Sequence, residues 1–168
     1  MFQTGEKVIY GIHGVCAVTG REESRENGSA VSYLVLQPVG QDGSRYLVPE
    51  GNPVAMSRLH KVLTAKELEA LLDSGDILSG SWIADENQRK QLYRTLIGSG
   101  DRISLMQRIH AIYKHKASQM AAGKKVHMCD DNFLRDAEKL LTGEISYVLE
   151  ISPEEAKKYL RSKLNANP

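Results

Sequence analysis

The residue types that could do nucleophilic chemistry lie close together near the start of the chain. His13 and Cys16 are three residues apart, and a histidine can activate a thiol when a third group orients it. No orienting group follows in the nearby sequence. On a small sheet, His13 would lie in a loop and Cys16 in the core. We therefore expect these two residues to be structural rather than catalytic.

A second group of reactive side chains lies between two predicted helices. His127, Cys129, Asp130 and Asp131 combine residue types that ligate metal ions. Four ligands within five residues would need a very tight loop, and helix capping explains the aspartates. Cys16 and Cys129 form no C-x-x-C pair, so a disulfide framework or zinc ribbon is not expected. We predict no metal and no cofactor.

Enzyme motifs are absent from the sequence. The Walker-type G-x-x-x-x-G-K-[ST], the dinucleotide-binding G-x-G-x-x-G and the metalloprotease H-E-x-x-H do not occur. We expect that the protein is not an enzyme and has no small-molecule substrate.

Positive charge is concentrated in the middle of the chain. The 168 residues carry a net charge of only +1, but residues 87–127 contain nine Lys and Arg against Asp101 alone. A solvated face normally mixes signs, so this block favours contact with nucleic-acid phosphates, which gives affinity without sequence readout. Lys90 and Arg94 share one helical face at i,i+4 spacing. An ordinary solvated surface is the alternative.

The only tryptophan, Trp82, lies at the edge of this basic block. It follows the polar, glycine-containing segment Ser79-Gly80-Ser81 between two predicted helices. Two interpretations are open. Trp82 is either a core anchor for the start of the next helix, or a partly exposed residue that inserts into or stacks on nucleic acid.

The first 62 residues have the pattern of short antiparallel strands. Runs rich in β-branched and aromatic residues cover 8–10, 15–18, 31–36 and 46–48. Asn27-Gly28 and Asp42-Gly43 are typical of tight hairpin turns. Four or five short strands predict a small SH3/Tudor-like antiparallel β-barrel, whose exposed edges make strand addition by a partner available.

From Thr64 the pattern changes to helix. Capping boxes begin at Thr64 and Ser152, and a cap at Asp130 or Asp131 opens a long helix. Apolar residues recur at spacings of three and four, as in the stripe from Ile103 to Met120. The spacing predicts an all-α bundle of about five helices, at approximately 64–75, 84–97, 102–121, 130–150 and 153–164.

Composition excludes several classes of protein. Hydrophobic residues make up 41% and charged residues 26%, which fits a packed domain rather than a disordered chain. The longest apolar run has four residues, whereas a spanning helix needs about 20. The first residues show no basic leader or apolar region, so we expect a cytoplasmic protein with reduced thiols and no membrane contact.

The order of motifs along the chain resembles the CarD family of bacterial transcription regulators. Gly5-Glu6-Lys7-Val8-Ile9-Tyr10 and His13-Gly14-Val15 are similar to that family's opening motif, G-[DE]-x-V-V-Y…H-G. Later matches follow the same order and cover nearly the whole chain: Tyr33-Leu34-Val35-Leu36, Val48-Pro49, Trp82, Gly100-Asp101, Ala137-Glu138-Lys139-Leu140-Leu141 and Gly143-Glu144. The same N-terminal module occurs in transcription-repair coupling factors.

The resemblance implies a division of labour between two domains. Residues 1–62 would be a Tudor-like domain that binds the β subunit of RNA polymerase, and residues 63–168 would contact promoter DNA beside the melted region. The family's tryptophan, here Trp82, inserts into the minor groove while basic residues hold phosphates. Such contacts would change open-complex stability with little sequence specificity, and would associate the protein with the nucleoid through the polymerase.

Candidate residues follow from the resemblance and from the charge pattern. The candidate DNA contacts are Trp82, Arg89, Lys90, Arg94, Arg108, Lys124 and Lys125. The candidate polymerase contacts are Arg25, Arg45 and Leu47. Asp85 and Glu86 depart from the family, whose members carry basic residues soon after the tryptophan, and they would oppose phosphate. They motivate an alternative function, a protein-interaction adaptor that uses the barrel edge without a DNA role.

Overall fold

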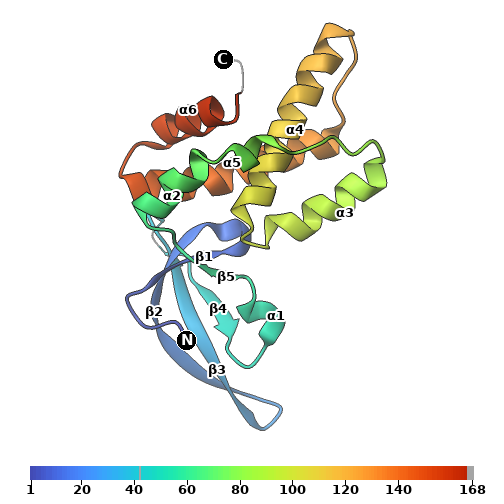
Figure 1. Ribbon diagram of the computed structural model, residues 1–168. Helices are drawn as coiled ribbons and strands as arrows, with labels where there is room; N and C mark the ends of the chain where they lie inside the picture. The colour runs from blue at the N-terminus through green and yellow to red at the C-terminus, as the bar shows by residue number, and fades with distance from the viewer. Residues whose placement is uncertain (42, 166–168) are drawn as a thin grey trace. The chain divides into compact units, whose positions relative to one another are not determined.

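The computed structural model describes residues 1–41 and 43–165 and divides the chain into two compact units, Met1–Val62 and Leu63–Pro168. All strands belong to the first unit and the long helices to the second (Figure 1). Asp42, which is predicted to lie in a turn, falls outside the described residues. Among the described residues, no helix is long and apolar enough to cross a membrane.

The N-terminal unit is built on one five-stranded antiparallel sheet. Its strands are β1 (Lys7–Tyr10), β2 (Val15–Glu26), β3 (Ser29–Pro38), β4 (Tyr46–Pro49) and β5 (Leu59–Lys61). The order β4-β3-β2-β1-β5 places β4 and β5 at the two edges. An antiparallel strand unit before the helices is therefore confirmed, whereas closure into an SH3/Tudor-like barrel is not.

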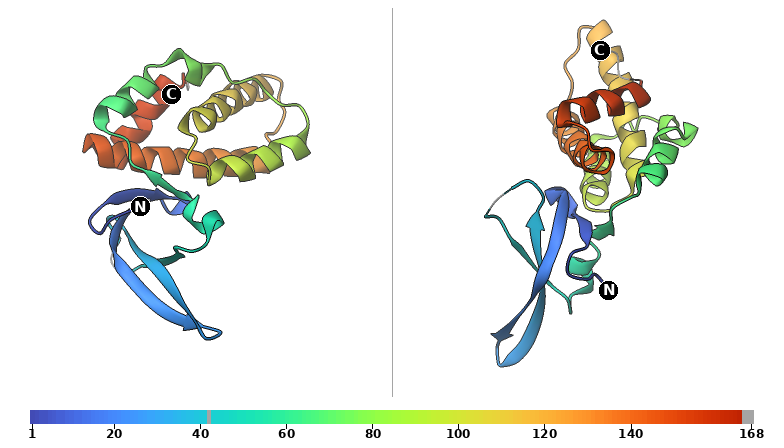
Figure 2. Two further views of the ribbon diagram at one scale, coloured as in Figure 1. Left: turned by 60° about the horizontal axis from the view of Figure 1, so that its bottom comes forward. Right: turned by 90° about the vertical axis from the view of Figure 1, so that its left-hand side faces the viewer.

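The β2–β3 hairpin is the longest pairing in the sheet. The predicted turn Asn27-Gly28 joins the strands, and both residues have positive φ values, +50° and +84°, as this kind of tight turn requires. The register shifts between Val18 and Gly20, which marks a β-bulge at Thr19. Figure 2 shows the twisted hairpin extending past the other strands.

Alternation along the strands places one set of side chains in the core of the sheet. This core consists of Val8, Cys16, Val18, Leu34, Leu36, Val48 and Leu59. Ala55 and Met56 of a short helix, α1 (Pro53–Met56), pack against it. The sequence analysis did not predict α1, which begins with Asn52 as its cap and a proline at its first position.

The second unit contains five α-helices, as predicted. They are α2 (Ala65–Leu72), α3 (Glu86–Ile97), α4 (Arg102–Ala121), α5 (Met128–Leu149) and α6 (Pro153–Lys163), with a short 3-10 helix, η2 (Gly75–Leu78), after α2. Both capping boxes form, at Thr64 and at Ser152. The predicted aspartate cap of α5 is wrong, because α5 begins at Met128 and places both aspartates inside its first turn.

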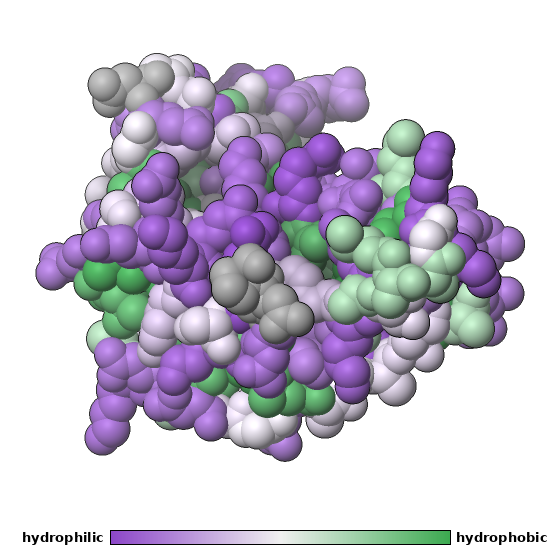
Figure 3. Space-filling view, turned by 90° about the horizontal axis from the view of Figure 1, so that it is seen from above, coloured by the Kyte–Doolittle hydropathy of each residue, from purple (hydrophilic) through white to green (hydrophobic). Residues whose placement is uncertain are grey.

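The core of the helical unit is one cluster drawn from all of its α-helices. Its largest fully buried members are Leu68, Leu72, Ile77, Met106, Ile109, Ile112, Ile145, Leu160 and Leu164. The predicted stripe on α4 is wrong at its two ends, since Ile103 is 38% and Met120 72% exposed. The C-terminal end of α4 extends beyond its neighbouring helices (Figure 1). Figure 3 shows one face of the molecule, on which hydrophilic side chains cover most of the surface and hydrophobic ones appear in smaller patches.

Candidate functional site

Strand β4 forms one free edge of the sheet. Val48 pairs with Leu34 and is fully buried, while Leu47 pairs with Val35 and is 42% exposed. Only β3 pairs with β4 in the described sheet, so the other edge of β4 has no strand partner there, which is the arrangement that strand addition requires. Leu47 places an apolar side chain on the outer face beside that edge.

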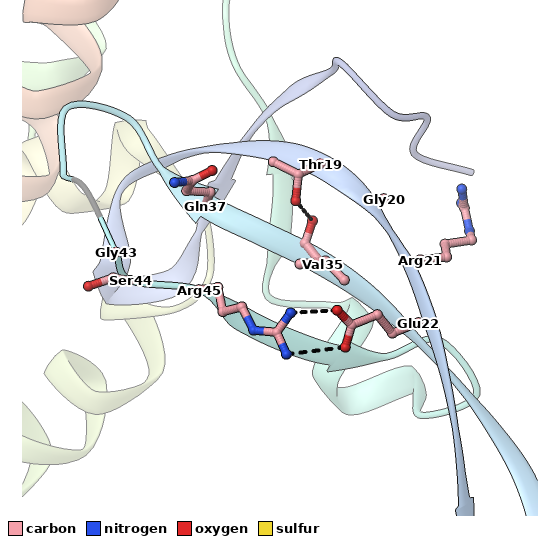
Figure 4. Close-up of a pocket in the computed structure, with 9 residues that line it drawn as sticks. All are labelled: Thr19, Gly20, Arg21, Glu22, Val35, Gln37, Gly43, Ser44 and Arg45. Atoms are coloured by element: carbon pink, nitrogen blue, oxygen red, sulfur yellow. Dashed lines mark hydrogen bonds and ion pairs between the residues drawn. The ribbon is translucent and has the colours of Figure 1, made fainter.

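A hollow of about 430 Å³ lies on the same face. The residues that line it, all drawn in Figure 4, are Thr19, Gly20, Arg21, Glu22, Val35, Gln37, Gly43, Ser44 and Arg45. Arg45 donates to Glu22 through both terminal nitrogens, Nη1 to Oε1 at 2.5 Å and Nη2 to Oε2 at 3.3 Å (Figure 4). Both side chains are exposed, and such surface pairs contribute less than about 1 kcal/mol, so the guanidinium is available to another anion.

The third candidate polymerase contact, Arg25, is not part of this surface. Arg25 pairs with Ala30 near the tip of the hairpin. It is three residues from Glu22 on the same strand, so the two side chains project from opposite faces. The structure thus brings Arg45 and Leu47 to one face and leaves Arg25 on the other.

Trp82 lies in the segment between η2 and α3, where its indole is half-buried. The His115 imidazole of α4 stacks on the indole, with ring centroids 3.6 Å apart and planes 7° from parallel. The Arg89 guanidinium carbon lies 4.4 Å from the indole centroid. Trp82 therefore packs partly on the helical core and keeps part of its ring at the surface, so each interpretation of the sequence describes part of its environment.

Helix α4 also holds the backbone that precedes Trp82. Gln107 donates from Nε2 to the Asp76 carbonyl at 2.9 Å, and Arg108 donates from Nη1 to the Ser81 carbonyl at 2.7 Å. A Cβ at Gly80 would lie 2.2 Å from the Gln107 carbonyl oxygen, so only glycine fits there. Arg108, a candidate DNA contact, serves in this structure to position the tryptophan segment.

Arg89, one of the candidate DNA contacts, is buried in the structure. The residue is 3% exposed, and Nε and Nη2 form a two-fold bond with Asp130 at 3.0 and 3.1 Å. Its Nη1 donates to the carbonyls of Ile83 and Ala84, both at 3.1 Å. A guanidinium with these partners has no face free for a phosphate.

Tyr93 completes the polar cluster around Asp130. Its hydroxyl donates to Asp130 Oδ1 at 2.6 Å, and burial together with this carboxylate raises the pKa of Tyr93 well above its ordinary value. The carboxylate of Asp130 is fully buried and accepts bonds from Arg89 and Tyr93.

Lys90 and Arg94 lie side by side on α3, as their spacing predicts. Both line a groove of about 470 Å³ that also includes Tyr93, Ile97 and Phe133. Lys90 forms an ion pair with Glu86 at 2.8 Å, and Arg94 is exposed. The groove also includes Asn132 and Asp136, so it places the two cations beside apolar side chains and one acid.

The two acidic residues that follow Trp82 have structural partners. Asp85 caps α3 by accepting a bond from the Gln88 amide at 2.8 Å. Glu86 pairs with Lys90 and lies 3.5 Å from His127 Nδ1. The hydrogen bond from Lys90 is the largest of the effects that lower the pKa of Glu86. Both carboxylates thus have bonding partners on α3.

Lys124 and Lys125 are exposed in the connection between α4 and α5. The connection ends at His127, which approaches Glu86 in the first turn of α3. The two lysines therefore belong to a segment that runs toward the Lys90 side of α3.

The two groups of reactive residues found in the sequence have structural surroundings. Cys16 is fully buried in the sheet core, and burial raises the pKa of its thiol to about 11. The His13 ring packs against the Tyr46 ring, with centroids 4.1 Å apart and planes tilted by 30°. Asp131 pairs with Lys116 at 2.8 Å. Within the described residues, no group of three or more His, Cys, Asp and Glu side chains is placed to hold a metal ion.

The sequence analysis does not identify the side chains that position Trp82. The helical pattern places His115 opposite the apolar stripe of its helix and gives no role to Gln107. Each lies more than 20 residues from the segment it holds, so no local pattern signals the contact. The glycine at position 80 is the one residue of the sequence that could indicate this close packing.

Comparison with known proteins gives a domain assignment for the first unit. No curated protein sequence matches the chain. Residues 2–60 match the family described as the CarD-like/TRCF RID domain, a range that begins before β1 and ends within β5. The resemblance of the N-terminal motifs is confirmed, and this part of the chain is a CarD-like/TRCF RID domain.

Proposed function

We propose that the chain is a transcription regulator that binds the β subunit of bacterial RNA polymerase through its N-terminal unit and contacts promoter DNA with its helical unit. The observation that carries the proposal is the RID domain at residues 2–60, which supports an RNA polymerase-interacting, transcription-related protein. The proposed role includes no catalytic step and no cofactor.

The polymerase contact in this proposal uses the edge strand β4. An added strand from the partner would bond the free backbone groups of β4, while Leu47 packs on an apolar side chain and Arg45 exchanges Glu22 for a partner carboxylate. Main-chain bonds supply affinity in such contacts and side-chain pockets supply specificity. Arg25 on the opposite face contributes little.

The DNA contact uses Trp82 with the exposed cations around it. A half-buried indole held by His115 is a preorganised apolar wedge for an unstacked base step. Lys90 and Arg94, with Lys124 and Lys125 on the neighbouring connection, would provide positive charge for the phosphates. Phosphate contacts of this kind carry no sequence information, so the protein would act at many promoters.

Open-complex stability changes in this proposal because the wedge needs a melted or distorted step. A ligand shifts an equilibrium between two states only by the difference between its affinities for them. Trp82 would favour the open complex because unstacked base steps occur there. Where the departure of the polymerase from the open complex limits the rate, the same contact would slow initiation.

The test is the lifetime of the open complex, measured with purified polymerase, a promoter fragment and the full chain after addition of a competitor. Trp82→Ala should retain polymerase binding and lose the effect on lifetime. Tyr147→Ala removes a second aromatic side chain of the helical unit, which is 37% exposed, and should retain both activities. A full effect on lifetime from Trp82→Ala would contradict the DNA contact.

A protein-interaction adaptor is the second candidate function. It is favoured by the internal bonds of Arg89 and Arg108, which remove two cations from the surface available to DNA. If the chain is an adaptor, it should bind polymerase and add no salt-dependent contact to the promoter. If the affinity of the chain for promoter DNA falls as the salt concentration rises, the DNA role is supported.

A further inference from the structure

A cleft of about 620 Å³ lies in the helical unit, away from the residues assigned to DNA contact above. Its walls come from α5 and α6, with one residue from α4. Five of the residues that line it are cations: Lys116, Arg135, Lys139, Lys157 and Arg161. The segment 128–168 is acidic overall, so this concentration of positive charge arises from folding.

Two of the five cations are neutralised by acids of the same cleft. Lys116 Nζ lies 2.8 Å from Asp131, and Arg161 Nη2 lies 3.1 Å from Glu138. Glu138 also accepts a hydrogen bond from the hydroxyl of Tyr113, so its carboxylate is held on both sides. These two pairs hold four of the residues that line the cleft in place.

The remaining three cations are weakly paired or unpaired. Arg135 reaches only Asp136, at 3.5 Å, in a pair whose two side chains are mostly exposed. Within residues 1–41 and 43–165, Lys139 and Lys157 form no ion pair. Glu154 is the third lining acid, so five cations face three acids and the cleft keeps a net positive charge.

The cations of the cleft recur at helical spacing on both of its main helices. Arg135 and Lys139 are four residues apart on α5, and Lys157 and Arg161 are four residues apart on α6. Like charges at this spacing repel one another, while the lining acids Asp131 and Glu154 lie one turn before Arg135 and Lys157. Both helices direct such a pair into one cleft, and a bound anion there would give a partner to Lys139 and Lys157, for which the described residues supply no ion pair.

We propose that this cleft between α5 and α6 binds a phosphate group. Cations on two opposing walls suit a ligand with several anionic oxygens, and a lysine ammonium binds phosphate as a point charge. The phosphate comes either from the backbone of DNA or from a free oligophosphate. The site does not depend on the role of Trp82.

The test compares two double variants of the full chain that lose the same charge. Lys139→Ala with Lys157→Ala removes the two unpaired lysines of the cleft. Lys66→Ala with Lys158→Ala removes exposed lysines of α2 and α6 that do not line it. Pyrophosphate binding is followed by titration calorimetry, and binding of a 20-base-pair duplex by fluorescence anisotropy over a series of salt concentrations.

The cleft variant should bind at least one of the two probes about tenfold more weakly than the wild type and the control variant. Weaker duplex binding, with a salt slope smaller by about 0.9 for each phosphate that the variant no longer neutralises, assigns the phosphate to DNA. Weaker pyrophosphate binding alone assigns it to a free oligophosphate. Equal binding of both probes by the two double variants would overturn the proposal. Trp82→Ala should leave pyrophosphate binding unchanged, and this control distinguishes failure of the cleft from failure of the DNA contact at Trp82.

Discussion

Replacing Asp130 with alanine should destabilise the helical unit strongly. The Asp130 carboxylate is fully buried and bonds Arg89 through two oxygens. The variant leaves the Arg89 guanidinium, itself 3% exposed, without its counter-charge, and it removes the acceptor of the Tyr93 hydroxyl.

The size of the effect follows from the burial of the pair. Removing one partner of a buried ion pair costs about 3–5 kcal/mol, because the other charge is left in a low-dielectric interior. The carbonyls of Ile83 and Ala84 still accept from Arg89 and lower the cost, while the unsatisfied Tyr93 hydroxyl adds to it. We expect a loss of about 4 kcal/mol, a large share of the roughly 5–15 kcal/mol that stabilises a typical domain.

The neighbouring residue supplies a matched control. Asp131 pairs with Lys116 at the surface, where such pairs contribute about 0–1 kcal/mol. The assay is urea denaturation followed by circular dichroism at 222 nm, which reports the helices. Asp131→Ala should shift the midpoint only slightly, and Asp130→Ala should shift it several times further.

A double variant separates the ion pair from general packing. Arg89→Met combined with Asp130→Ala removes both charges, so the destabilisation should fall about 2 kcal/mol or more below the sum of the single variants. Equal and small effects of Asp130→Ala and Asp131→Ala would refute the reasoning, and would return Arg89 to the exposed candidates for DNA contact.

Three further predictions concern the surroundings of Trp82 and the interior of α5. Gly80→Ala should lower stability by about 1–3 kcal/mol and shift the emission of the single tryptophan, because a Cβ there meets the Gln107 carbonyl at 2.2 Å; unchanged melting and emission would contradict this. Thr142→Val should raise stability by about 1 kcal/mol, measured by thermal melting, because the Thr142 hydroxyl is the one buried side-chain polar atom in the described part of the chain without a hydrogen-bond partner. Burial lowers the pKa of His115 below 6.5, so between the two pKa values the unfolded chain binds more protons than the folded chain. The free energy of unfolding should therefore fall as the pH drops from about 6.5 to the pKa of the folded state. His115→Gln should flatten this pH dependence, measured by urea denaturation.

Much of the fold could be predicted from local signals. The capping boxes at Thr64 and Ser152 each satisfy their bonds within four residues, so the sequence alone carries the information. Asn27-Gly28 likewise defines its hairpin through backbone preferences of two residues. The strand order could not be predicted, because the pairing of β1 with β5 joins residues about 50 positions apart. Helix α1 could not be predicted, because four residues are too few to show a helical periodicity.

The candidate site could be predicted only in part, because the charge of a segment does not reveal which cations reach the surface. The acidic partners of Arg89 and Arg102 lie more than 40 residues away, at Asp130 and Glu144, and both pairs are largely enclosed. Arg108 reaches a backbone carbonyl 27 residues earlier in the chain. These contacts depend on helix packing, whereas the adjacency of Lys90 and Arg94 depends only on the helical repeat.

The binding of the full chain to purified bacterial RNA polymerase, and to a fragment of its β subunit, tests the proposed role of the sheet edge. Biolayer interferometry should show binding to both. Leu47→Asp should weaken binding about tenfold or more, and Arg25→Glu, on the opposite face of the hairpin, should leave it nearly unchanged. Binding to neither target, or equal affinities for the Leu47→Asp variant and the wild type, would contradict the assignment of β4 as the polymerase contact.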